Sequence, residues 1–308
     1  MPAITIDHDG ATPALRSDVP SPTPAAGEIL VRVRASSVNP MDGAIAAGML
    51  KGMVEHVFPI TLGRDFAGTV EAVGDGVTAV AAGDEVFGVV PAMWPTVHAG
   101  AWAELISVAE TTLVKRPDSV DVAVAGVAGL APVAAAAAVD AIAPQAGETV
   151  LVVGATGGVG SVAVQLVGAA GATVVASALP EDEDYLRELG VTEVVARDGD
   201  VAAAVRKRSP DGVDALIDLV SYAPGAYDGA LKPGARVAST LNAAGEGPGR
   251  TNVNAVPSPE VLGRIAGLLA DGSLKLPITA TYDLADAPTA LADLGAKQTQ
   301  GKLAIRLR

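Results

Sequence analysis

A glycine-rich stretch follows an apolar run near the middle of the chain. It reads VVGATGGVGSV over residues 152–162. Compared with the dinucleotide pattern G-x-G-x-x-G, Gly157 and Gly160 hold the second and third glycine positions, while Ala155 replaces the first. Gly157 would let the backbone approach a pyrophosphate, and Gly160 would let the following helix pack closely. Gly154 can form the tight bend instead of Ala155, because glycine tolerates positive φ.

The surroundings of this stretch favour nucleotide binding over an ordinary strand–helix turn. A strand is expected to end at Val153 and a helix to begin near Gly158, whose free N–H groups would face a phosphate. Further strand–helix units follow, as in a nucleotide-binding sheet. The predicted contacts are Gly154, Ala155, Thr156, Gly157, Gly158, Val159 and Gly160.

The end of the second strand indicates which nucleotide is bound. NAD sites carry Asp or Glu there, whereas this strand ends with Ser177 and Ala178. Loss of the acid removes repulsion of a 2′-phosphate, so Ser177 is a predicted cofactor contact and NADPH is favoured, with NADH as the alternative. The acids EDED at 181–184 are expected to stabilise a helix start, and Arg187 or Arg197 could supply the missing positive charge.

Two polar residues in the first half are spaced to act together. Asn39 and Asp42 are the first and last residues of the sequence NPMD, where they would orient a nicotinamide or a substrate. The equally weighted alternative is capping, with Asp42 starting a short helix.

Composition narrows the class of protein. The 308-residue chain carries a net charge of −14 without a basic cluster, which excludes a nucleic-acid partner. It has no cysteine, which excludes disulfides and thiolate sites, and its first residues suggest no leader, so we expect a cytoplasmic protein. An uncharged run at 122–139 is rich in Ala and Gly and contains Pro132, so we expect a buried helical region there and no membrane span.

The order of elements predicts an α/β protein with two domains. Residues 1–117 show period-two strands at 28–36, 66–74, 83–90 and 101–108 and a helix at 40–48. Residues 118–256 alternate strands at 149–155, 173–178, 192–197, 213–220 and 235–240 with helices at 158–171, 181–190, 201–209 and 223–231. Residues 257–308 are too few for a core of their own, so they should complete the first domain.

Several motifs together resemble the medium-chain dehydrogenase/reductase superfamily, in its zinc-free quinone-oxidoreductase branch. They are SSVNPMDGAIAAG (36–48), FPITLGRDFAGTVEAVGDGV (58–77), GDEVFG (83–88), GETVLVVGATGGVGSVAVQL (147–166) and GKLAIRL (301–307). The resemblance implies a GroES-like β-rich catalytic domain plus a Rossmann doubly wound parallel-sheet nucleotide domain. It also implies a homodimer.

Zinc-dependent members of the superfamily bind the metal at positions that match Asn39, Arg64 and about Val127. None of these suits zinc, so the resemblance implies no metal. Arg64 would occupy the corresponding volume and pair with Asp42 or Asp65. The predicted catalytic residues are therefore Asn39, Asp42 and Arg64.

Without a Lewis acid, hydride transfer suits an acceptor that is already electron-poor. The predicted function is NADPH-dependent reduction of quinones or α,β-unsaturated carbonyl compounds, with a small-molecule electrophile as the partner and a proton from solvent. The branch often carries tyrosines where this chain has Ala44 and Leu50, which leaves the acceptor open. By position, further cofactor contacts are Asp218, Leu219, Thr240, Leu241, Asn242 and Lys302, although a solvated lysine is the alternative for the last.

Two other functions remain open. An enoyl-thioester reductase would be expected to show a basic patch for carrier phosphates, which the acidic chain lacks. A non-catalytic nucleotide-binding protein, of a crystallin or regulatory type, would keep the same fold.

Overall fold

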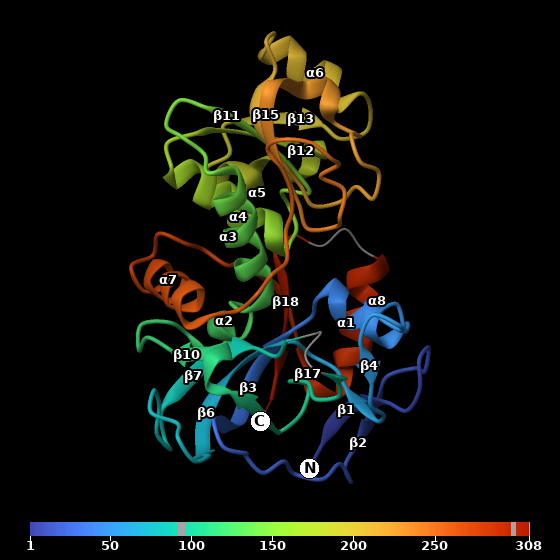
Figure 1. Cartoon of the computed structure of the whole chain (residues 1–308), viewed down its shortest axis with the longest axis vertical. Helices are drawn as coiled ribbons and strands as arrows, with labels where there is room; N and C mark the ends of the chain where they lie inside the picture. Colours follow the sequence, from blue (N-terminus) through green and yellow to red (C-terminus); the bar gives the residue numbers. More distant parts are fainter. Residues whose placement is uncertain (92–95, 297–299, 308) are drawn as a thin grey trace. The chain divides into compact units, whose positions relative to one another are not determined.

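A computed structural model describes residues 1–91, 96–296 and 300–307, which pack as two units (Figure 1). Unit 1 comprises Met1–Leu130, Pro257–Ser273 and Pro277–Arg308. Unit 2 comprises Ala131–Val256 with Leu274–Leu276. The domain limits at residues 117 and 256 stay predictions.

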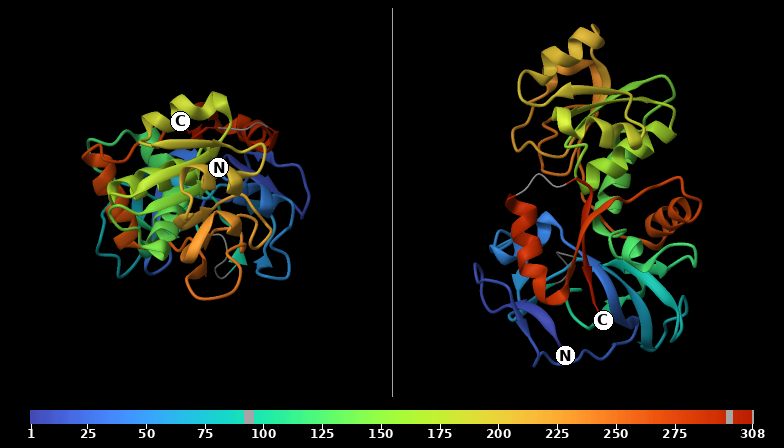
Figure 2. Two further views of the ribbon diagram at one scale, coloured as in Figure 1. Left: turned by 90° about the horizontal axis from the view of Figure 1, so that it is seen from above. Right: turned by 180° about the vertical axis from the view of Figure 1, so that it is seen from behind.

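Unit 1 is built on a seven-stranded sheet in the order β10-β7-β6-β3-β18-β17, with β9 also paired to β3. The strands are β3 (Glu28–Ser37), β6 (Asp65–Val73), β7 (Glu85–Val89), β9 (Leu105–Ala109), β10 (Leu113–Lys115), β17 (Ile278–Asp283) and β18 (Lys302–Arg306). β3 alternates buried and partly exposed residues, as its period-two pattern predicts. Its antiparallel partner β18 comes from the end of the chain, so both chain ends belong to this unit (Figure 2).

Smaller elements complete unit 1. A three-stranded sheet has the order β2-β1-β5, and a two-stranded one pairs β4 with β8. These strands are β1 (Ala3–Ile6), β2 (Ala14–Arg16), β4 (Glu55–His56), β5 (Ile60–Thr61) and β8 (Thr96–Val97). The helices are α1 (Pro40–Ala46), α2 (Val122–Gly126), α7 (Pro259–Ala270) and α8 (Ala287–Ala296). α8 packs against α1, where Leu291 lies close to Gly43.

Unit 2 contains a six-stranded sheet whose pairings are all parallel, in the order β13-β12-β11-β14-β15-β16. The strands are β11 (Thr149–Val153), β12 (Thr173–Ala178), β13 (Glu193–Ala196), β14 (Val213–Asp218), β15 (Leu231–Ser239) and β16 (Arg250–Asn252). Between them lie α4 (Gly158–Ala169), α5 (Glu183–Glu188) and α6 (Val201–Arg208). Counted from β11, this is the 3-2-1-4-5-6 order of doubly wound dinucleotide-binding sheets, which confirms the predicted Rossmann fold.

Two predictions in this region are wrong. The helix expected at 223–231 is reduced to one 3-10 turn, Asp228–Ala230, because Pro224 lacks an N–H and Gly225 has φ +80°. The strand expected at 235–240 begins earlier, at Leu231. Its register against β14 shifts between Val213 and Ala215, so the sequence Lys232-Pro233-Gly234, which is typical of a turn, lies at an irregularity inside the strand. Strand β16 is not predicted.

The uncharged run at 122–139 is helical, and it is divided between α2 and α3 (Leu130–Ile142). Most of the α3 side chains are buried, as expected for a helix of small residues. Over the described ranges, no helix combines the length and apolar character needed to cross a membrane.

Candidate active site

The first candidate residues lie at the start of α1. Asn39 is the N-cap, and α1 begins at Pro40, which confirms the start of the helix predicted at 40–48. Asp42 is the third residue of this helix and does not start it. The Asp42 carboxylate accepts hydrogen bonds from the N–H groups of Asn39, at 2.8 Å, and Gly63, at 3.1 Å. Capping is therefore one role of Asp42, as the sequence allows.

The side chain of Asn39 points to other partners. Its Nδ2 donates to Ser37 Oγ at 3.2 Å and to Asp65 Oδ2 at 3.0 Å. Its Oδ1 accepts from Lys302 Nζ at 2.6 Å. Because each amide hydrogen has a protein acceptor and the side chain is buried, these contacts fix the orientation of the amide.

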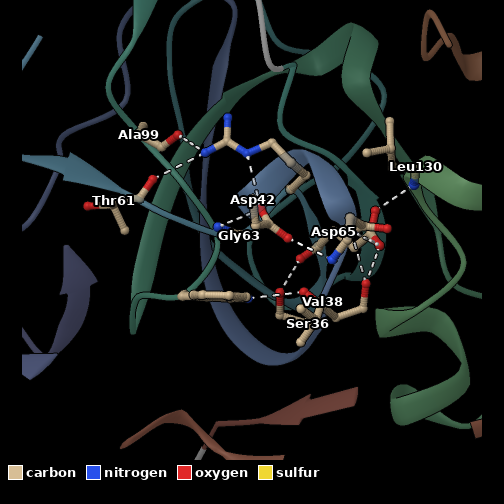
Figure 3. A network of polar contacts seen from close by, with 12 residues as sticks. Ser36, Val38, Asp42, Thr61, Gly63, Asp65, Ala99 and Leu130 are labelled. Carbon is tan, nitrogen blue, oxygen red and sulfur yellow. Dashed lines mark hydrogen bonds and ion pairs between the residues drawn. The ribbon is translucent and has the colours of Figure 1, made fainter. Parts of the chain in front are cut away.

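Asp65, which is expected from the sequence only as a partner of Arg64, is the centre of this cluster. It is fully buried at the start of β6 and accepts hydrogen bonds from the Ser37 hydroxyl and from the N–H of Leu130 (Figure 3). Lys302 Nζ lies 3.5 Å from its Oδ2. A Cβ on Gly129 would lie 2.4 Å from Asp65 Oδ1, so the chain before α3 can approach this closely only with glycine.

Arg64 is buried beside this cluster, with 1% of its surface exposed. Its Nη2 donates to the carbonyls of Thr61, at 3.1 Å, and Ala99, at 2.8 Å. Its Nε lies 3.9 Å from Asp42 Oδ1 and makes no hydrogen bond among the described residues. Asp42 and Asp65 are the two predicted partners of Arg64, and the ion pair forms with Asp42. Figure 3 marks this contact at the labelled Asp42 with a dashed line.

We call Ser37, Asn39, Asp42, Arg64, Asp65 and Lys302 the buried charge network. Burial raises the pKa of Asp42 to about 6, although the nearby charge of Arg64 opposes the shift. Burial also lowers the pKa of Lys302, against the attraction of Asp65 and Asp42. Burial lowers the pKa of Arg64 as well, but a guanidinium stays protonated in proteins. The network thus pairs two carboxylates with two basic side chains, and all four groups are buried.

The donor set does not fit zinc. Asn39 and Arg64 hold two of the matched positions, and the third, Val127, is an apolar residue buried at the end of α2. Zinc prefers thiolate, imidazole or carboxylate, whereas here the carboxylates face a guanidinium and an ammonium group. Within the described part of the chain, no three His, Cys, Asp or Glu side chains gather as a metal site would require.

The glycine turn, residues 154–160, has the backbone geometry that a pyrophosphate requires. Gly154 has φ +85°, which confirms that it takes the bend in place of Ala155. A Cβ on Gly160 would lie 2.1 Å from the carbonyl oxygen of Gly154, so α4 can pack on the turn only with glycine. Gly157 is the N-cap of α4 and offers no side chain, so the first N–H groups of the helix have no side-chain cap. The residues present therefore fit a dinucleotide phosphate.

The other predicted cofactor contacts of unit 2 lie at the same edge of its sheet. Ser177 is aligned with Val153, the last residue before the turn, and so is Asp218. Asp218 Oδ1 accepts from the N–H groups of Val220 and Ser221, which shapes the loop that begins at Leu219.

The remaining predicted contacts, Thr240, Leu241 and Asn242, follow β15. Ser239 Oγ accepts from the N–H groups of Leu241 and Ala243, and Asn242 has φ +59°. Asp218 and Ser239 are aligned in the sheet, so this loop begins at the same edge.

Lys302, by contrast, belongs to unit 1 and is buried, so the alternative of a solvated lysine is wrong.

Comparison with known proteins agrees with this architecture. A family model described as an alcohol dehydrogenase GroES-like domain matches residues 25–118, and one described as a zinc-binding dehydrogenase matches residues 189–305. The chain is 29% identical over 221 residues to a chloroplast envelope quinone oxidoreductase homolog from Arabidopsis thaliana, covering 70% of this chain and 66% of that one. It is 32% identical over 309 residues to phthioceranic/hydroxyphthioceranic acid synthase from Mycobacterium tuberculosis, covering 92% of this chain but 14% of the synthase.

Among solved structures, the quinone oxidoreductase from Coxiella burnetii matches with a TM-score of 0.89 and 27% identity, over 100% of this chain and 99% of that one. The chain belongs to the medium-chain dehydrogenase/reductase superfamily of NAD(P)-dependent oxidoreductases, in its quinone-oxidoreductase-like branch.

Proposed function

We propose that the chain is an NADPH-dependent reductase of quinones or α,β-unsaturated carbonyl compounds that works without a metal ion. The buried charge network carries the proposal, because it places Arg64 and Lys302 beside the two carboxylates that could otherwise bind a metal. An unactivated alcohol is hard to oxidise without a Lewis acid that lowers the pKa of its hydroxyl, whereas an electron-poor acceptor needs far less help. The bound cofactor would supply a hydride from its nicotinamide ring.

The two units would contribute in different ways. The glycine turn and the N-terminus of α4 would hold the pyrophosphate with backbone N–H groups. In the buried charge network, Asp65 and Lys302 fix the Asn39 amide, while Asp42 fixes the start of α1. We propose Asn39, Asp42 and Arg64 as site residues. Because their polar atoms already bind protein groups, the contribution we assign to them is to position the surrounding backbone.

A direct assay tests the proposal. We expect loss of NADPH absorbance with a panel of quinones and enones, and unchanged rates after dialysis against a zinc chelator. Saturable cofactor binding without turnover on any acceptor would favour a non-catalytic protein. A rate that depends on added zinc would contradict the metal-free mechanism.

One observation favours a second candidate, an enoyl-thioester reductase. The similarity to the mycobacterial acid synthase extends over 92% of this chain, more than the similarity to the plant homolog. Both candidates transfer a hydride to an electron-poor acceptor, so the identity of the acceptor distinguishes them. A crotonyl thioester reduced faster than any quinone or free enone would replace the first proposal with the second.

A further inference from the structure

Arg197 lies beside the end of β12, the second strand of the nucleotide-binding sheet. It directly follows β13, and its backbone N–H donates to the carbonyl of Ala178, the last residue of β12, at 3.0 Å. β12 in turn is paired with β11, which leads into the glycine turn. The sheet therefore fixes the order of these strand ends, from the turn to Ser177 and then to Arg197.

The end of β12 offers no acidic group for ribose hydroxyls. Ser177 and Ala178 are both small, uncharged and buried. In dinucleotide-binding sheets this strand end lies near the adenine ribose, where a carboxylate selects NAD and an arginine accommodates a 2′-phosphate. A positive side chain next to this end therefore has a direct bearing on cofactor choice.

The guanidinium of Arg197 is partly exposed and only weakly paired. Its Nε lies 3.6 Å from Asp198 Oδ1, and the exposed fractions of the two side chains are 34% and 75%. Such surface pairs are weak. No partner for its two Nη nitrogens occurs among the described residues. The other candidate, Arg187, is instead bound to Glu183 one turn earlier on α5, through both Nε and Nη2.

We propose that Arg197 binds the 2′-phosphate of NADPH and thereby sets the preference for NADPH over NADH. The inference rests on the proposed function. A guanidinium offers two parallel N–H donors to a phosphate, and its weak pair with Asp198 is readily exchanged for a doubly charged group. Glu181 is exposed in the 3-10 turn Pro180–Asp182, which follows β12 closely, so its negative charge should keep the preference moderate.

Cofactor binding without an acceptor tests the assignment. We would titrate the full chain with NADPH and NADH in a calorimeter and compare it with Arg197→Gln. The Kd for NADPH should rise about tenfold, while the Kd for NADH should change by less than about twofold. Arg187→Gln is the matched control, because it removes the same charge from an arginine already bound to an acid, and it should leave both Kd values unchanged. Asp198→Asn should tighten NADPH binding only.

The outcomes separate this inference from the proposed function. Equal changes for NADPH and NADH in Arg197→Gln, or an equal loss in Arg187→Gln, would overturn the role of Arg197 while leaving the reductase intact. If the unaltered chain bound neither dinucleotide, the proposed function would fail, and the role of Arg197 with it.

Discussion

The buried charge network of unit 1 and the glycine turn of unit 2 are both candidate sites, but they are built by opposite means. The network consists of charged and polar side chains drawn from residues 37, 39, 42, 64, 65 and 302. The turn consists of backbone, and its requirement is the absence of a Cβ at Gly160 and a positive φ at Gly154. The first site should therefore be sensitive to loss of charge, and the second to added volume.

The largest effect is expected from removing a charge from the buried charge network. Lys302→Met leaves the Asp65 carboxylate and the Asn39 amide without their cation in a buried place, so the free energy of unfolding should fall by about 4 kcal/mol. Denaturant unfolding measures it. Arg306→Met is the control on the same strand, because Arg306 forms an exposed pair with Asp283 and should contribute less than about 1 kcal/mol. Similar losses in both variants would contradict the prediction.

The volume side is tested by Gly160→Ala. The new methyl group would meet the backbone of Gly154 and Ala155, so α4 must move, and unfolding should become easier by about 3 kcal/mol. Dinucleotide binding should be lost as well, and calorimetry measures both. Gly168→Ala, in the same helix, meets nothing within 4 Å and should slightly stabilise the chain. If Gly160→Ala kept normal stability and normal dinucleotide binding, the proposed role of the glycine turn would be wrong.

Acidity sharpens the comparison, because the glycine turn contains no titratable side chain and the charge network does. Burial raises the pKa of Asp42 from 3.8 to about 6. Between these values the native chain binds more protons than the unfolded chain, so the contribution of Asp42 to the free energy of unfolding falls as pH rises from about 4 to about 6. Relative to Asp42→Asn, the free energy of unfolding of the unaltered chain should fall by at most about 3 kcal/mol over this pH range. Parallel curves for the two proteins, followed by denaturant unfolding, would argue against it.

The smallest effect concerns the loop after β15. Ser239→Ala removes the acceptor of the Leu241 and Ala243 N–H groups, so we expect a loss of about 1 kcal/mol and weaker dinucleotide binding. Ser209→Ala serves as the control, since that side chain takes no part in the hydrogen bonds of the described residues. Unchanged affinity in Ser239→Ala would show that the loop does not depend on this serine.

Local patterns predicted most of the strands and helices. The alternation of apolar and polar residues in β3 predicted a strand with one buried face. The continuous apolar runs of β11 and β12 predicted strands that are buried on both faces. The motifs at the glycine turn predicted α4 within a few residues. Where prediction failed, at 223–231, composition suggested a helix but Pro224 and Gly225 allow only a short turn. β16 is three residues long and gives no periodic signal.

The candidate site was only partly predictable. Asn39 and Arg64 were found because they stand where related enzymes carry zinc ligands, and Asp42 was found from its spacing to Asn39. The structure brings the three together. The central place of Asp65 was missed, although an acid at the start of an apolar strand is itself a signal. That Ser37, Leu130 and Lys302 all contact Asp65 depends on the packing of β3, β18 and the start of α3, which are far apart in the chain, and spacing cannot reveal this.

The contacts of Arg64 limit how a metal centre could be engineered at this position. Replacing Asn39 with cysteine and Arg64 with histidine would restore two ligand types, but it would also remove the donor that ties the carbonyls of Thr61 and Ala99 together. Lys302 would meanwhile lose its amide acceptor and keep its charge near the incoming ion. A designer would thus have to rebuild the loops and remove the lysine in the same step, so single substitutions should not lead from this site to a zinc enzyme.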